Sequence, residues 1–388
     1  MRKDFSAVWQ AYFNPDLRPE LNARWITPQV LENVLAYLPD SVKRTVIGRS
    51  AEGRPVHQLQ LGTGAKNVLA WAAMHGNETT AMRGWLDLFL AIENPAIQSY
   101  YDDLLAEFTI YFIPLLNPDG AQRFTRRNAM GLDMNRDARV LQTPEMQLLS
   151  GLISNLKPVL AFNLHDQRNI FTAGDKPATL SFLAPSVDEA RTVTLKRAQT
   201  MDLIGAAATA IKPVLTGGIG RYTDEYYPTA IGEWVQQQDI PAILVECGPA
   251  TNDPLRNEAR MVNPIILHAV LTRFSAKQNP DTSTYNSIPV NLTNQVDVLI
   301  KGVITTLKGF EATIDIALLA EESVQNNIYT RTLKMHDVGD LRQLVGLETY
   351  TWKSTIALGS LSIGSVAEME LITDKGRISI EAGSLKTG

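Results

Sequence analysis

The sequence predicts an α/β fold, with a mixed, mostly parallel twisted sheet flanked by helices and a small all-β module at the C-terminal end. Short, nearly continuous apolar runs, typical of strands buried on both faces, alternate with segments of helical spacing. After about residue 278 a polar stretch leads into sequence that alternates with a period of two. We therefore expect a large domain over residues 1–280 and a small β-rich domain over residues 285–388.

The first expected element is a β-hairpin at the edge of the sheet, because residues 43–62 form two alternating segments around an Ala-Glu-Gly turn. One helix has a clear start signal, since the hydroxyl of Thr143 precedes Pro144 at the first helical position. Ligand sites in open α/β sheets lie beyond the carboxyl ends of the strands, so polar residues that follow the apolar runs are candidates for chemistry. The runs are residues 67–74, 108–116, 159–164 and 242–245, and the expected helices are 143–156, 187–211 and 254–274.

Composition excludes several classes of function. The formal net charge is -5, so no basic field is available to attract nucleic acid or a membrane surface. Cys247 is the single cysteine, which excludes an intrachain disulfide and a thiolate-rich metal site. No apolar run is long enough for a signal-peptide core or a membrane span, so the expectation is a cytoplasmic protein.

Histidine and glutamate follow two of the apolar runs. His75 and Glu78 come directly after the run 67–74, and His165 follows the run 159–164. Zinc accepts imidazole nitrogen and carboxylate oxygen, and catalytic zinc sites have three protein ligands and one open position. A His-x-x-Glu pair is commonly a solvated turn, and a strand-end histidine is as often structural, so only the combination indicates a metal site.

Two further segments carry candidate site residues. After the turn Asn-Pro-Asp-Gly at residues 117–120, a loop contains Arg126, Asn135 and Arg136. Nearby arginines usually form a solvated basic loop, but the guanidinium fork also suits bidentate binding of a carboxylate. Glu246 directly follows the run 242–245, and a carboxylate there is costly unless it is paired or wetted, which favours a position in a cleft.

The order of these motifs resembles the zinc carboxypeptidase family, the carboxypeptidase A-like metallopeptidases. His-x-x-Glu, Asn-Pro-Asp-Gly, Arg-x-Asn-x-x-Gly-x-Asp-x-Asn-Arg, a strand followed by His and a strand followed by Glu occur in this order over roughly residues 40–275. The resemblance implies that residues 1–280 form a catalytic domain that binds one Zn²⁺ ion and hydrolyses peptide bonds as an exopeptidase. By this resemblance the metal ligands are His75, Glu78 and His165, and the acid that orients His75 is Asp133. The general base that activates the zinc-bound water is Glu246, and the arginine that stabilises the oxyanion is Arg126. The residues that bind the terminal carboxylate are Asn135 and Arg136.

The resemblance implies a peptide substrate with a free C-terminal carboxylate, with cell-wall stem peptides among the candidates. The family has a mobile tyrosine ahead of its catalytic glutamate, and of Tyr222, Tyr226 and Tyr227 we favour Tyr227 as the residue that contacts substrate. The residue that lines the pocket for the terminal side chain falls near residues 231–233 but is not defined, so the side-chain preference stays open. The oligomeric state and the role of residues 285–388 also stay open.

Two alternatives fit part of the sequence. An N-acyl amino acid deacylase of the aspartoacylase or succinylglutamate desuccinylase type shares His-Gly-x-Glu, Asp-x-Asn-Arg and a distal His, and often ends in a β domain. The Asn-Pro-Asp-Gly turn and the Arg-x-Asn-x-x-Gly spacing argue against it. A non-catalytic protein that binds peptide ends is disfavoured, because binding would need neither Glu246 nor an open metal position.

Overall fold

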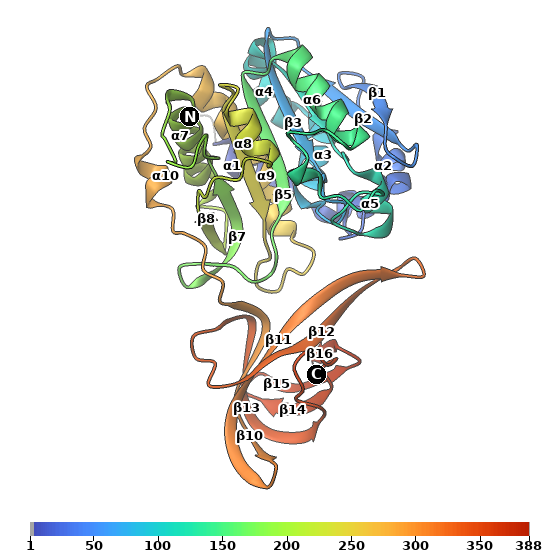
Figure 1. Cartoon of the computed structure of the whole chain (residues 1–388), viewed down its shortest axis with the longest axis vertical. Coiled ribbons are helices and arrows are strands. Elements are labelled where there is room, and N and C mark those ends of the chain that lie inside the picture. Colours follow the sequence, from blue (N-terminus) through green and yellow to red (C-terminus); the bar gives the residue numbers. More distant parts are fainter. Residues whose placement is uncertain (1–3, 388) are drawn as a thin grey trace.

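Two separate β-sheets organise the chain in the computed structural model, which describes residues 4–387 (Figure 1). Within these residues the first sheet has the order β1-β2-β4-β3-β5-β9-β7-β6, with β8 paired to β7, and the second has the order β12-β11-β10-β13-β14-β15-β16. Within residues 4–387 helices pack on the first sheet alone, which confirms the predicted α/β region and the separate C-terminal β module.

The elements have the following bounds. The strands of the first sheet are β1 (Lys43–Arg49), β2 (Pro55–Leu61), β3 (Lys66–Ala72), β4 (Phe108–Ile113), β5 (Leu160–Asp166), β6 (Thr172–Ala173), β7 (Lys176–Leu183), β8 (Gly218–Arg221) and β9 (Ala242–Cys247). The α-helices are α1 (Phe5–Tyr12), α2 (Pro28–Leu35), α3 (Thr80–Ala91), α4 (Pro95–Glu107), α5 (Pro118–Arg123), α6 (Pro144–Leu156), α7 (Leu195–Ile211), α8 (Ile231–Gln236), α9 (Asn257–Ser275) and α10 (Ser283–Ser287). The second sheet contains β10 (Gln295–Leu307), β11 (Phe310–Gln325), β12 (Ile328–Gly339), β13 (Val345–Leu358), β14 (Met369–Thr373), β15 (Gly376–Glu381) and β16 (Ser384–Thr387).

The central strands β4, β3, β5 and β9 run parallel and are covered on both faces. Successive side chains of a strand point to opposite faces, and in β3 Val68 and Ala70 enter one apolar core while Leu69 and Trp71 enter the other. The first core lies against α1, α3, α4, α7 and α9, and the second lies against α6 and α8. Burial on both faces explains why these strands read as nearly continuous apolar runs.

Most of the elements predicted from the sequence are confirmed. Strands β1 and β2 pair antiparallel with β1 at the sheet edge, and the hydroxyl of Thr143 caps α6 by accepting a hydrogen bond from the N–H of Met146. The helix expected over residues 187–211 is too long at its start, because α7 begins only after Thr194. Before it, the Asp188 carboxylate accepts the N–H of Thr192 and Arg191 has a φ of 56°, so local side-chain hydrogen bonding replaces helix there.

The polar stretch that begins after about residue 278 is partly folded into the first region. Its residues 283–287 form α10, and Tyr285 is buried in the first apolar core together with Ile288. The hydroxyl of Tyr285 accepts a hydrogen bond from the N–H of Ala184. We therefore propose that the boundary between the two regions lies between Ile288 and Gln295. Across residues 4–387, none of the helices combines the length and the apolar character needed to cross a membrane.

Candidate active site

The carboxyl ends of three central strands bring the predicted site residues together. His165 and Glu246 lie at the ends of β5 and β9 and are partners in the parallel register, so their side chains leave the sheet side by side. His75 follows the end of β3, the strand on the other side of β5. Residues that are far apart in sequence therefore meet at one edge of the sheet, as expected for open α/β sheets.

The loop that carries His75 and Glu78 is fixed by the turn at residues 117–120. The side-chain amide of Asn117 donates to the carbonyl of Met74 at 3.1 Å, and its oxygen accepts the N–H of Gly120 at 2.8 Å. Gly76 lies so close to this turn that an added Cβ would come within 2.0 Å of the Gly120 carbonyl carbon. The Asn-Pro-Asp-Gly motif thus supports the loop that carries His75 and Glu78.

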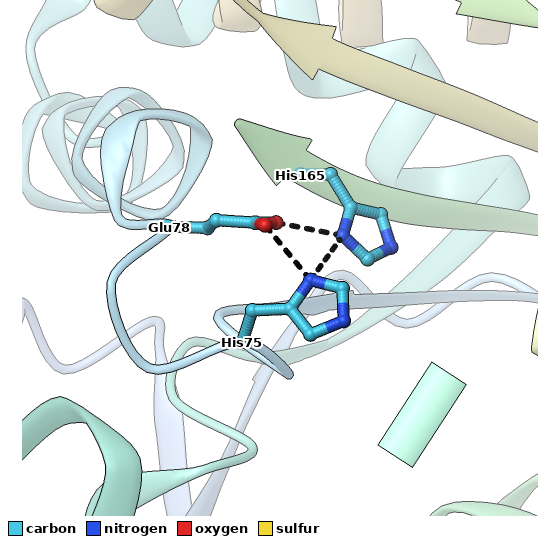
Figure 2. A group of neighbouring side chains, drawn as sticks. All are labelled: His75, Glu78 and His165. Atoms are coloured by element: carbon cyan, nitrogen blue, oxygen red, sulfur yellow. Dashed lines mark hydrogen bonds and ion pairs between the residues drawn. The ribbon is translucent and has the colours of Figure 1, made fainter. Parts of the chain in front are cut away.

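The side chains of His75, Glu78 and His165 converge on one point (Figure 2). His75 Nδ1 lies 2.9 Å from Glu78 Oε1 and 3.2 Å from His165 Nδ1, and His165 Nδ1 lies 2.8 Å from Glu78 Oε2. All three residues are buried. Two imidazoles and a carboxylate with an open side make a donor set that zinc accepts.

The hydrogen bonds around this group fit a metal site. His75 Nε2 lies 3.1 Å from Asp133 Oδ1. A proton on Nε2 leaves the lone pair of Nδ1 directed toward Glu78 and His165, the other two metal-ligand candidates. Burial alone would raise the pKa of Asp133, but hydrogen bonding to His75 and the charges of His75 and Arg126 hold it well below its usual range. The pKa of Glu78 is likewise lowered by the two histidines against the effect of burial. An acid that is hydrogen-bonded to a ligand histidine is the arrangement by which metal sites fix the orientation of the imidazole.

Glu246 faces the same cavity as the metal-ligand group. Burial, followed by the negative charges of Glu78 and Asp166, raises its pKa well above the usual range of a glutamate. Because Glu246 is in register with His165, its carboxyl group lies beside the three metal-ligand candidates.

The loop after the turn places its polar residues on the cavity wall. Arg126 Nη1 lies 3.1 Å from both His75 Nδ1 and Glu78 Oε1, and its side chain is 45% exposed. Arg136 is exposed, and its guanidinium packs on the ring of Tyr227 at 4.3 Å from the centroid. The side-chain oxygen of Asn135 accepts the N–H of Ile231 at 3.0 Å, which fixes the orientation of its amide. Arg126, Asn135 and Arg136 all line the cavity.

The three candidate tyrosines have different positions. Tyr222 lines the cavity and donates to Gln167 Oε1 at 3.1 Å, and its pKa is raised by burial and by the charges of Glu246 and Glu78. Tyr227, the tyrosine predicted to contact substrate, is 51% exposed and contacts Arg136 instead of lining the cavity. A direct contact between Tyr227 and substrate stays a prediction.

The cavity has a volume of about 910 Å³ and includes residues that no sequence motif indicated. Asp166 directly follows His165, so its position next to a metal-ligand candidate was a usable signal. Arg24, Arg256 and Glu322 come from distant segments and carry no motif. Arg24 joins two of these acids, because its Nη1 donates to Asp166 Oδ2 at 2.8 Å and its Nε donates to Glu322 Oε1 at 3.2 Å.

Comparisons with known proteins agree with this geometry. Residues 27–171 match the family model described as zinc carboxypeptidase. Carboxypeptidase A2 of Mus musculus is 33% identical over 99 residues, which cover 24% of this chain and 23% of the relative. Probable carboxypeptidase 2 of Arthroderma benhamiae is 28% identical over 169 residues, which cover 44% of this chain and 27% of the relative. The chain thus spans about a quarter of the length of these curated relatives.

Solved structures share the fold. A metallo-carboxypeptidase from Burkholderia cenocepacia aligns with a TM-score of 0.52 at 18% sequence identity, over 64% of this chain and 70% of that chain. At this identity the alignment is evidence for the fold alone.

Proposed function

We propose that this chain, which belongs to the zinc carboxypeptidase family through residues 27–171, is a zinc-dependent metallocarboxypeptidase that removes the C-terminal residue of peptides. The observation that carries the proposal is the convergence of His75 Nδ1, Glu78 and His165 Nδ1, with separations of 2.8 to 3.2 Å, beside Glu246. A peptide-end binding protein would not need this combination of an open donor set and an adjacent proton acceptor.

The proposed metal residues would hold zinc through two imidazole nitrogens and a carboxylate. When bound there, zinc would polarise the scissile carbonyl and lower the pKa of water to ~7. Asp133, which lies 3.1 Å from His75 Nε2, would hold the imidazole in the tautomer that directs the Nδ1 lone pair toward the metal. Glu246, which is in register with His165, would take a proton from the attacking water and return it to the leaving amine.

The two arginines of the loop have different proposed roles, which are stabilisation of the oxyanion and binding of the terminal carboxylate. Arg126, next to Glu78, would donate to the oxygen on which negative charge develops, where one well-placed donor contributes about 3–4 kcal/mol. Arg136, exposed in the cavity and stacked on Tyr227, would bind the terminal carboxylate with Asn135 beside it. Capture of the chain end would set the last peptide bond over the metal, which makes the reaction exopeptidic.

Mass-spectrometric product analysis of zinc-loaded protein tests this proposal. The substrates are free-ended peptides, their C-terminally amidated counterparts, cell-wall stem peptides and N-acyl amino acids. We expect loss of single C-terminal residues from free-ended peptides and little cleavage of the amidated ones, because amidation removes the charge that Arg136 would bind. Stem peptides are included because their free carboxylate could bind to the same two residues, Asn135 and Arg136.

The other outcomes would change the assignment. Cleavage confined to the N-acyl amino acids would make the protein a deacylase, and binding without cleavage would make it a peptide-end binding protein. Equal cleavage of free and amidated peptides would show that Arg136 does not bind the terminal carboxylate. The explanation of exopeptidase action by capture of the chain end would then be wrong.

A further inference from the structure

The C-terminal module extends a two-stranded ribbon toward the catalytic region. Strand β11 pairs with β10 from Phe310 to Leu318. From Leu319 to Gln325, β11 pairs with β12. We call this ribbon, residues 319–334, the arm (Figure 1). A two-stranded hairpin is only marginally stable by itself, so the contacts of the arm with the first region decide where it lies.

The arm is anchored at the rim of the cavity by one buried guanidinium. Glu322 on β11 accepts from Arg24 twice, with Nε at 3.2 Å from Oε1 and Nη2 at 3.3 Å from Oε2. The same Arg24 donates through Nη1 to Asp166, the neighbour of His165, at 2.8 Å. The arm is therefore connected to the strand end that carries a metal-ligand candidate.

A second contact holds the outer part of the arm. The hydroxyl of Tyr329 on β12 donates to Glu322, and its ring meets Phe124 edge-on with centroids 5.3 Å apart. Phe124 is the residue that ends α5, so the arm contacts the turn that supports the loop of His75 and Glu78. Charge-assisted hydrogen bonds and an aromatic contact together favour a docked arm over a freely moving one.

Residues of the docked arm form part of the cavity that contains the site. Leu319, Ala320, Glu321 and Glu322 line the same cavity of about 910 Å³ as the metal-ligand group. The rest of the wall comes from strand ends and loops of the first region. Ligand cavities of ~300–1,000 Å³ hold molecules of drug size, which corresponds to a peptide of a few residues.

We propose that the arm is a wall of the substrate cleft that selects short peptides, of roughly two to five residues, over long chains and the ends of folded proteins. This inference rests on the proposed function and specifies its substrate class. The arm acts by limiting the space for the part of the peptide that precedes the scissile bond.

A pair of kinetic measurements tests the wall. The kcat/KM of the intact zinc-loaded protein is compared for a tripeptide and a dodecapeptide that end in the same two residues. We expect the tripeptide to be preferred by about ten-fold or more, and we expect the double variant Leu319→Ala/Glu321→Ala to bring the two values within about three-fold. Glu311→Ala, at the exposed far end of β11, is the matched control and keeps the preference.

A labelling measurement tests the wall without turnover. The natural Cys247 is buried, so Glu321→Cys adds an accessible thiol on the cavity wall, and Glu311→Cys adds one at the far end of the strand. In a Glu246→Gln background, a bound tripeptide should slow alkylation of the thiol at position 321 by about five-fold or more and leave the thiol at position 311 unchanged.

The outcomes distinguish a failure of the proposal about the arm from a failure of the proposed peptidase function. Equal kcat/KM for both lengths, or cleavage with no protection at position 321, overturns the wall and leaves the proposed function intact. Protection by the tripeptide without any cleavage supports the wall and overturns the peptidase. If the protein neither cleaves the peptides nor is protected by the tripeptide at position 321, both the wall and the proposed peptidase activity are overturned.

Discussion

Arg24 is the residue whose removal we expect to disturb the structure most, because it links the two regions from a buried position. Its side chain is 3% exposed and donates to Asp166, Thr80 and Glu322. The perturbation is Arg24→Met, which keeps most of the length of the side chain and removes its charge and its donors.

The size of the effect follows from the groups left behind. Removal of one partner of a buried ion pair costs about 3–5 kcal/mol, because the other charge stays buried without compensation. Asp166 keeps Arg256 at 3.7 Å and the hydroxyl of Thr80 at 2.7 Å, so it is not left alone. Glu322 is 20% exposed and is partly solvated. We therefore expect a loss of unfolding free energy near the lower limit, about 3 kcal/mol.

Denaturant unfolding of the full chain, followed by circular dichroism, measures this loss. Arg24→Lys is the matched control, since it keeps the charge and loses the planar fork, and it should recover about half of the free energy. A double-mutant cycle with Glu322→Gln isolates the coupling across the two regions, which we expect to be about 1–2 kcal/mol. A loss below about 1 kcal/mol for Arg24→Met would refute the view that this residue holds the arm in place.

Four other predictions concern the site and its stability. Glu246→Gln should reduce kcat by at least about a thousand-fold with unchanged zinc content by atomic absorption, and appreciable residual turnover would argue against it as the base. Asp133→Asn should weaken zinc affinity by about 10–100-fold in a chelator competition, whereas unchanged affinity would deny it a supporting role. Arg136→Met should lower kcat/KM for free-ended peptides by about a hundred-fold while Arg127→Met, which alters an exposed arginine on the same loop, leaves it unchanged; equal losses would point to a general charge effect. The pKa of Glu322 is lowered from 4.5 to about 2, because the charges of its arginine partners outweigh burial, so its stabilisation is present above pH 4.5 and is lost as the pH falls toward 2. The difference in unfolding free energy between the wild type and Glu322→Gln should therefore shrink by about half between pH 7 and pH 3, and a constant difference would contradict the lowered pKa.

Several features of the fold and site were predictable because they depend on short segments. The central strands are buried on both faces, so their apolar runs identify them directly, as β5 with seven buried residues illustrates. His75, His165 and Glu246 follow such runs closely, and parallel strands bring their carboxyl ends to one edge. The start of α7 was not predictable from helical spacing, because a local hydrogen bond to Asp188 competes with helix formation.

The choice among the tyrosines depended on tertiary structure. Tyr222, Tyr226 and Tyr227 lie within six residues, and no spacing rule separates them. The path of the loop directs Tyr222 to Gln167 on the cavity wall and Tyr227 to Arg136. Which side chain faces the cavity is set by contacts with other segments, so the sequence alone could only name the candidates.

By itself, the sequence determined the α/β class, the C-terminal β module and the set of residues from which a zinc site could be built. The class and the module follow from the periodicity of local segments, and the candidate zinc residues follow from short motifs and their order along the chain. The tertiary structure alone decided that the C-terminal module takes part in the cavity. Arg24 and Glu322 are separated by 298 positions, and their contact depends on how two independently packed sheets meet. No local pattern encodes such a contact, because the free energy that selects it arises only when both surfaces are already folded.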